Sequence, residues 1–112
     1  MGPLQSDLPS FRGLHVLLVD NCQLYRAMTS VVLRNLGLQV TPANDGHEAV
    51  AALQQRDFDL VLMDVEMPGM DGLTATTEIR EREARLSKYT PIVALTSTTD
   101  RDQCFAVGMD AR

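Results

Sequence analysis

The sequence contains few features of nucleic-acid-binding, disulfide-rich or repeat proteins. Its 10 Lys and Arg are outnumbered by 15 Asp and Glu, which gives a net charge of −5. We therefore expect no nucleic-acid-binding surface, since that would normally show as a basic patch. The two cysteines, Cys22 and Cys104, lie far apart without metal-ligand spacing, which favours reduced thiols and a cytoplasmic location over a disulfide. We find no internal repeat and no low-complexity tract.

Long apolar runs are also missing. No stretch approaches the roughly 18 to 20 apolar residues that span a bilayer, so we expect no membrane contact by this domain, although a longer parent protein could carry an anchor. The opening M-G-P-L-Q-S lacks the basic start and apolar core of a signal peptide. We interpret residues 1–12 as a linker or leader and residues 13–112 as one domain, because 112 residues suffice for a single core.

Four short apolar runs predict β-strands. Residues 15–20 (H-V-L-L-V-D) and 60–63 (L-V-L-M) do not alternate with polar residues, which is typical of strands buried on both faces. Residues 38–41 alternate, which favours a strand nearer the edge of a sheet. Residues 91–96 (P-I-V-A-L-T) form the fourth apolar run.

Helical patterns separate these strands. In residues 24–36, apolar side chains recur every fourth position and form a stripe on one helix face, and Gly37 then ends the helix. Residues around 49–53 and 100–107 predict short helices, and residues 73–86 predict a third, longer one. This third helix contains E-I-R-E-R-E-A-R, so we expect a solvated outer face with weak ion pairs.

The alternation of strands and helices indicates an α/β fold with a parallel sheet covered by helices on both faces. Ligands of such sheets bind outside the carboxyl ends of the strands. The polar residues at the ends of three predicted strands are Asp20, Asn21, Asp64, Thr96 and Ser97. Carboxylate oxygens suit Mg²⁺, which is small and hard and prefers carboxylate and water ligands.

Four segments resemble a response-regulator receiver domain of the kind attached to hybrid sensor histidine kinases. They are V-D-N at 19–21, M-D-V-E-M-P-G-M-D-G at 63–72, V-A-L-T-S at 93–97 and G-M-D at 108–110. The second segment is highly specific, and the resemblance runs from about His15 to Arg112. It implies a flavodoxin/CheY-like, doubly wound parallel sheet with strand order 2-1-3-4-5. The fifth strand and the last helix of that fold are absent from this chain.

The resemblance also implies a phosphorelay function. Asp64 would be the phospho-acceptor, taking a phosphoryl group from a phosphohistidine on a histidine kinase or histidine phosphotransfer domain. Asp20, Asp64 and the backbone carbonyl of Glu66 would hold Mg²⁺, and the Asn21 amide would either join them or serve as a turn residue. Thr96 would hydrogen-bond a phosphoryl oxygen and couple phosphorylation to a conformational switch. Self-catalysed transfer and hydrolysis would be the only chemistry.

Two departures from the family leave a second reading open. Asn21 stands where the family usually has another acid, so we expect weaker metal binding. The family's phosphoryl-binding Lys has no counterpart here, since its position would follow Arg112. Both features favour a degenerate receiver that binds proteins without phosphate. A phosphohydrolase with an aspartyl nucleophile fits less well, because Glu66 and Met67 do not match its motif.

Partners and neighbouring elements are predicted in outline. Leu24, Tyr25 and Met28 would help to dock the phosphodonor. Without a fifth strand, residues 91–96 would form an apolar sheet edge that favours pairing with another chain, so a dimer or a parent multidomain kinase is expected. Asp71 immediately precedes a helical pattern, which is more typical of a helix cap than of a metal ligand.

Overall fold

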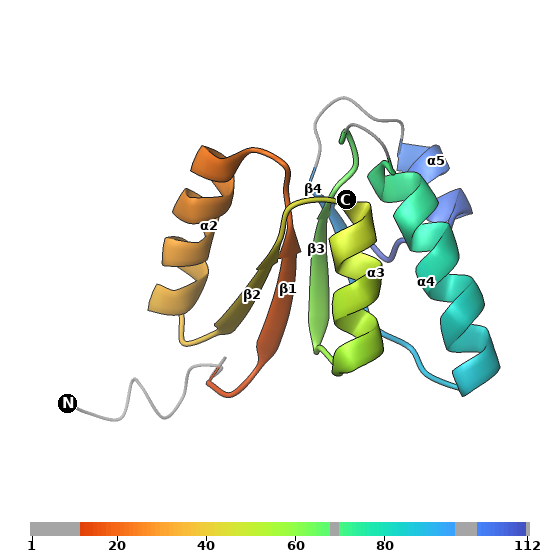
Figure 1. Ribbon diagram of the computed structural model, residues 1–112, viewed down its shortest axis with the longest axis horizontal. Coiled ribbons are helices and arrows are strands. Elements are labelled where there is room, and N and C mark those ends of the chain that lie inside the picture. Colours follow the sequence, from red (N-terminus) through yellow and green to blue (C-terminus); the bar gives the residue numbers. More distant parts are fainter. Residues whose placement is uncertain (1–11, 68–69, 96–100, 112) are drawn as a thin grey trace.

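Four parallel strands form one sheet in the order β2-β1-β3-β4, with helices on both sides of it (Figure 1). The computed structural model describes residues 12–67, 70–95 and 101–111. The sheet order confirms the predicted doubly wound α/β fold. In chain order the elements are β1 (His15–Val19), α2 (Gln23–Asn35), β2 (Gln39–Ala43), α3 (Gly46–Gln55), β3 (Leu60–Asp64), α4 (Gly72–Leu86), β4 (Ile92–Leu95) and α5 (Arg101–Ala106).

β1 lies inside the sheet and is buried along its whole length, as its unbroken apolar sequence predicted. It pairs with β2 on one side and with β3 on the other. Its alternate residues Leu17 and Val19 join the main core with Val61 and Met63 of β3 and with side chains from α3 and α4. Because successive side chains of a strand point to opposite faces, the residues between them point the other way, to the face on which α2 packs.

Aspartates cap the N-termini of two of the helices. The Asp45 side chain accepts a hydrogen bond from the Glu48 N–H at the start of α3 (2.9 Å). Asp71 accepts one from the Thr74 N–H at the start of α4 (2.8 Å). These carboxylates satisfy N–H groups that have no partner within the helix. The prediction that Asp71 caps a helix is therefore confirmed.

The apolar stripe predicted on the first helix faces outward. α2 lies beside β2 and β1, and Ser30 is its one buried residue. Leu36, which follows the helix, continues the exposed stripe, so this part of the chain leaves an apolar face without a cover from the described residues. The side chains more than half exposed are Leu24, Tyr25, Met28, Val31, Val32 and Leu36.

The outer edge of β4 is paired at one point. Ala111 forms a parallel bridge with Val93, and its carbonyl accepts a hydrogen bond from the Ala94 N–H (2.9 Å). The Asp110 N–H donates to the Ile92 carbonyl (2.8 Å). The chain after α5 thus runs alongside β4 as a fifth strand would. Within the described parts of the chain, no helix has both the length and the apolar character needed to cross a membrane.

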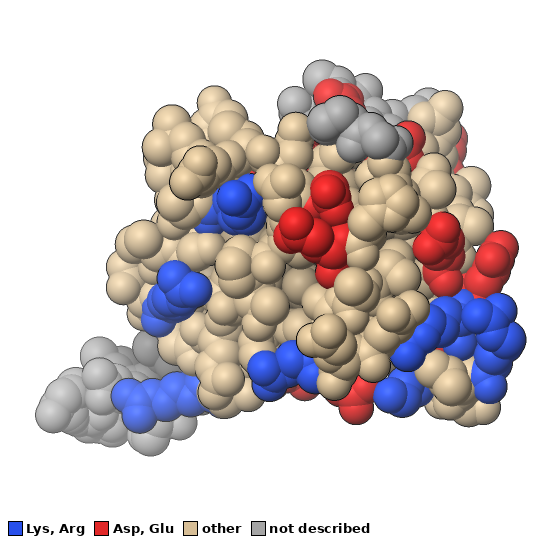
Figure 2. All heavy atoms as spheres, in the orientation of Figure 1, with Lys and Arg blue, Asp and Glu red and all other residues tan. Residues whose placement is uncertain are grey.

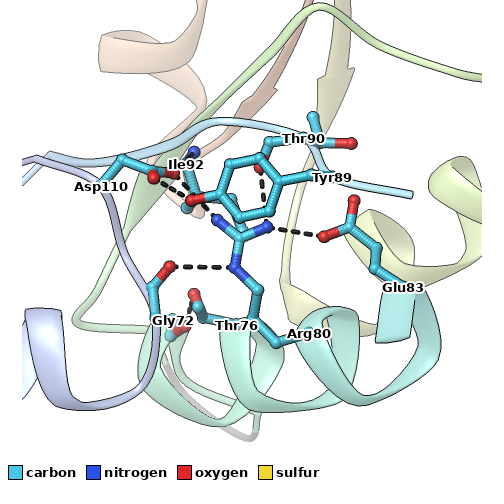
Figure 3. A network of polar contacts seen from close by, with 9 residues as sticks. Gly72, Thr76, Arg80, Glu83, Tyr89, Thr90, Ile92 and Asp110 are labelled. Carbon is cyan, nitrogen blue, oxygen red and sulfur yellow. Dashed lines mark hydrogen bonds and ion pairs between the residues drawn. The ribbon is translucent and has the colours of Figure 1, made fainter. Parts of the chain in front are cut away.

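A half-buried arginine joins α4 to the chain segments around β4 (Figure 3). Arg80 donates to the Glu83 carboxylate (2.6 Å), the Thr90 carbonyl (2.8 Å) and the Gly108 carbonyl (2.9 Å). It also pairs with Asp110 (2.9 Å), and the Arg80–Glu83 side chains are only 17% and 8% exposed. This network lies between α4 and β4, whereas the prediction of weak, solvated ion pairs concerned the outer face of the helix.

Candidate functional site

Asp20 and Asp64 lie side by side at the carboxyl end of the sheet. β1 and β3 are parallel, and Val19 is paired in register with Met63. The residues that follow Val19 and Met63 are Asp20 and Asp64. They therefore lie on the same rim, on neighbouring chain segments that are about 4.8 Å apart. In Figure 2, acidic atoms are spread over the middle and upper parts of this face of the molecule, and most of the basic atoms lie in its lower part.

The backbone holds one oxygen of each carboxylate. Asp20 Oδ1 accepts a hydrogen bond from the Cys22 N–H (2.9 Å), and Asp64 Oδ1 accepts one from the Glu66 N–H (3.1 Å). Both are contacts from an aspartate to the N–H two residues later, a pattern typical of a chain turning away from a strand. Both carboxylates are therefore oriented by the turns that follow their strands.

The two carboxylates act on each other electrostatically. Partial burial raises the pKa of Asp64 above its ordinary value, and the Glu66 N–H opposes this shift. The charges of Asp20 and Glu66, and a side-chain hydrogen bond with Asp20, raise the pKa of Asp64 further. Burial and like charges both disfavour the ionised form. A cation bound beside these groups would offset that repulsion.

The start of α4 packs directly against the backbone of Asp64. A side-chain carbon added at Gly72 would lie 2.5 Å from the Asp64 carbonyl oxygen and 2.7 Å from Val65 Cα, which no real contact allows. The Gly72 N–H also donates to the Val65 carbonyl (2.9 Å). The M-D-G end of the motif is thereby explained: Asp71 caps the helix, and glycine permits the close approach.

The predicted site residues have different outcomes. Asp20 and Asp64 are brought together and are each partly exposed, while Asn21 and Glu66 are exposed beside them. Thr96, together with Ser97, lies outside the described residues. Among the described residues, no group of three or more His, Cys, Asp or Glu side chains could hold a metal ion.

Two further residues at this rim were not anticipated from the sequence. Arg26 of α2 donates through Nη1 to the Asp20 carbonyl (2.6 Å) and to Asn44 Oδ1 (3.1 Å). Asn44 precedes α3, and its N–H donates to Glu48 Oε1 (2.8 Å). The sequence offers one signal for Arg26: it is the first charged residue after Asp20.

The donors at this rim fit a hard divalent cation. Two adjacent carboxylates, an amide and backbone carbonyls are oxygen ligands of the kind that Mg²⁺ prefers. Burial raises the pKa of Asp64 most, and the charges of Asp20 and Glu66 raise it further; a bound cation would relieve the repulsion among these charges.

Comparisons with known proteins identify the family of this chain. Residues 16–111 match the family described as response regulator receiver domain. The sensor protein GacS of Pseudomonas syringae pv. syringae is 42% identical over 105 residues, which cover 90% of this chain and 12% of GacS. The chain thus spans about an eighth of that relative.

Solved structures show the same fold. The receiver domain of the histidine kinase CKI1 from Arabidopsis thaliana, complexed with Mg²⁺, is 34% identical with a TM-score of 0.83, and the match covers 90% of this chain and 82% of that one. The receiver domain of the Saccharomyces cerevisiae response regulator Ssk1, crystallised with the histidine phosphotransfer protein Ypd1, is 25% identical with a TM-score of 0.82, covering 92% and 79%. This chain therefore belongs to the response regulator receiver domain family of two-component phosphorelays.

Proposed function

We propose that Asp64 accepts a phosphoryl group from a phosphohistidine of a partner protein. The supporting observation is the half-buried Asp64 carboxylate, which lies on the binding rim of the sheet beside Asp20 and has a raised pKa. In the reaction a carboxylate oxygen of Asp64 attacks phosphorus, the P–N bond breaks, and the electron pair leaves with the imidazole nitrogen. The rigid strand end and the turn at Glu66 hold the nucleophile in place for this displacement.

The other site residues have supporting roles in this proposal. Asp20, Asp64, the Glu66 backbone carbonyl and the Asn21 amide would hold Mg²⁺, which when bound supplies positive charge against the carboxylates and the phosphoryl oxygens. Thr96 would donate a hydrogen bond to the phosphoryl group. The charge of about −1.5 to −2 that phosphorylation adds would then be the signal for a conformational switch.

The proposed phosphodonor is a histidine kinase or a histidine phosphotransfer domain. The resemblance to Ssk1, which was crystallised with such a phosphotransfer protein, supports this choice. The N-terminal half of α2, with Leu24, Tyr25 and Met28 exposed, lies next to the rim that carries Asp20 and would form part of the docking surface. We also propose that the domain works in the cytoplasm, as part of a larger kinase.

We propose residues 13–112 as the receiver domain. Ala111 already pairs with β4, and Val31, Val32 and Leu36 leave an exposed apolar face near α2. A fifth strand and a last helix following Arg112 would extend the sheet beyond β4 and cover that face. The same β4 edge would otherwise favour a dimer.

A contact-only receiver is the alternative. It is favoured by the asparagine at position 21. The described residues also contain no group of three or more His, Cys, Asp or Glu side chains that could hold a metal ion. Such a module would bind its partner without accepting phosphate.

Phosphorylation can be tested with Mg²⁺ and acetyl phosphate, or with beryllofluoride as a mimic of the phosphoryl group. We expect a mass increase of one phosphoryl group, or a change in amide chemical shifts, that is lost in Asp64→Ala. Asp57→Ala is the matched control, since Asp57 is an exposed acid paired with Lys88 (2.8 Å) and precedes β3 instead of ending it. No response at saturating Mg²⁺, in a longer chain that includes the fifth strand and its lysine, would favour the contact-only module.

A further inference from the structure

Arg26 connects three chain segments at the carboxyl end of the sheet. Arg26 lies in the first turn of α2. Its guanidinium donates a hydrogen bond to the backbone carbonyl of Asp20, the residue that follows β1 (2.6 Å). It also binds the side chain of Asn44 (3.1 Å), between β2 and α3. The Asn44 N–H is in turn held by Glu48 of α3 (2.8 Å). One side chain therefore sets the spacing between the β1–α2 turn and the β2–α3 turn.

Asp20 is fixed by hydrogen bonds to its N–H, its carbonyl and its side chain. Its N–H donates to the Ala43 carbonyl of β2 (3.1 Å), its carbonyl is bound by Arg26, and its Oδ1 accepts the Cys22 N–H (2.9 Å). The Arg26 N–H donates to the Cys22 carbonyl (2.9 Å), which is the first hydrogen bond of α2. Both the backbone and the side chain of Arg26 thus contact residues 20–22, where Asp20 and Asn21 are located.

A guanidinium suits this task better than a local hydrogen bond would. A carbonyl beyond the end of a strand has lost its ladder partner, and an unpaired, partly buried carbonyl is costly. Arg supplies a charge-assisted bond and can reach two acceptors with one planar group. The contacts of Arg26 are made to the backbone of Asp20 and to Asn44, so its effect on the site is to place the ligands.

We propose that Arg26 is a positioning residue for the phosphoryl-transfer site, fixing the turn that carries Asp20 and Asn21. The inference rests on the function proposed above. Placement matters more here than in a site with three acids, because only two carboxylates attract the cation and the neutral Asn21 contributes no charge. Partners of metal-ligand residues typically change metal affinity by roughly 10- to 100-fold when removed.

The test compares Mg²⁺ binding in wild type, Arg26→Gln, Arg26→Lys and Arg34→Gln, followed by amide chemical shifts. Arg34 is the matched control, since it lies on the same helix and its guanidinium makes only a long, exposed hydrogen bond to the backbone, 3.4 Å to the Val40 carbonyl, among the described residues. We expect Arg26→Gln to raise the Kd for Mg²⁺ by about 10-fold or more, and Arg34→Gln to leave it within about twofold. Arg26→Lys should lie between them.

A second measurement separates positioning from mere stability. Thermal unfolding in EDTA reports the fold alone, and the phosphorylation rate at saturating Mg²⁺ reports the site once it is filled. If Arg26 positions the site, the Kd of Arg26→Gln for Mg²⁺ should be raised even at temperatures well below its unfolding temperature. Its phosphorylation rate should largely recover when the Mg²⁺ concentration is raised. A structural role predicts a lower unfolding temperature with an unchanged Kd, which would overturn the proposal.

The failures of the two proposals differ. If wild type binds Mg²⁺ and is phosphorylated while Arg26→Gln has the same Kd, the role of Arg26 is wrong and the proposed function stands. If wild type shows no Mg²⁺ binding, both are overturned. Should Arg26→Gln not fold, Arg26→Lys decides, and a Kd within about twofold of wild type would refute the positioning role.

Discussion

Replacing Arg80 by Met should cost a large part of the stability of the domain. Met keeps much of the aliphatic stem but removes every hydrogen bond of the guanidinium, whose Cζ atom also lies over the Tyr89 ring, 4.1 Å from its centre. These contacts join α4 to the chain before β4 and after α5. The Arg80 partners are Glu83, Tyr89, Thr90, Gly108 and Asp110.

The magnitude follows from what the substitution leaves behind. Glu83 is 8% exposed and would lose its ion-pair partner, and removing one member of a buried pair costs about 3–5 kcal/mol. Asp110 loses less, because the Ile92 N–H and the Tyr89 hydroxyl also donate to it. We therefore expect a loss of about 3–5 kcal/mol, against a total of roughly 5–15 kcal/mol for a domain of this size.

Urea unfolding at pH 7 measures this loss. The chain has no tryptophan, so circular dichroism is the suitable signal. Arg85→Met is the matched control, an exposed arginine on the same helix, and should change stability by less than about 0.5 kcal/mol. A loss below about 1 kcal/mol for Arg80→Met would refute the reasoning, because the network would then behave like exposed ion pairs.

Two further substitutions test other parts of the structure. Gly72→Ala places a carbon 2.5 Å from the Asp64 carbonyl oxygen, so urea unfolding should show a loss of about 1–3 kcal/mol, with slower phosphorylation by acetyl phosphate. Burial and the charge of Arg56 lower the pKa of His15 below 6.5, with Asp59 opposing. Stability from a neutral His15 is therefore complete above pH 6.5 and is lost as pH falls through the lowered pKa. Unfolding temperatures from pH 8 to 5 should decline in wild type and less steeply in His15→Phe, and equal slopes would contradict this.

The strands and the acidic rim could be predicted because both depend on the local sequence. An apolar run that ends in an acid, such as residues 60–64, fixes the strand and the rim position together. Parallel pairing then brings Asp20 beside Asp64 without any knowledge of side-chain contacts. The predicted helix at residues 73–86 begins one residue earlier, at Gly72, because Asp71 caps it.

The arginine contacts could not be predicted in the same way. E-I-R-E-R-E-A-R has the pattern of a solvated helix face, and nothing local distinguishes Arg80 from Arg82 or Arg85. Its partner Asp110 lies 30 residues further along, so the contact depends on how β4 and α5 pack. The exposed stripe of α2 has a similar cause, since periodicity identifies an apolar face and says nothing of what covers it.

Arg26 and Arg80 stabilise opposite ends of the sheet by the same means. Arg26 binds a carbonyl that follows β1, and Arg80 binds carbonyls that precede β4 and follow α5. Such carbonyls lie where the strand ladder or helix has ended, so they need donors from elsewhere in the chain. A guanidinium reaches several acceptors in its plane, whereas an ammonium is a single point of charge. Charge-conserving substitution by Lys should therefore be more costly at these two positions than at Arg34 or Arg85, which would show that geometry, and not charge alone, explains the arginines.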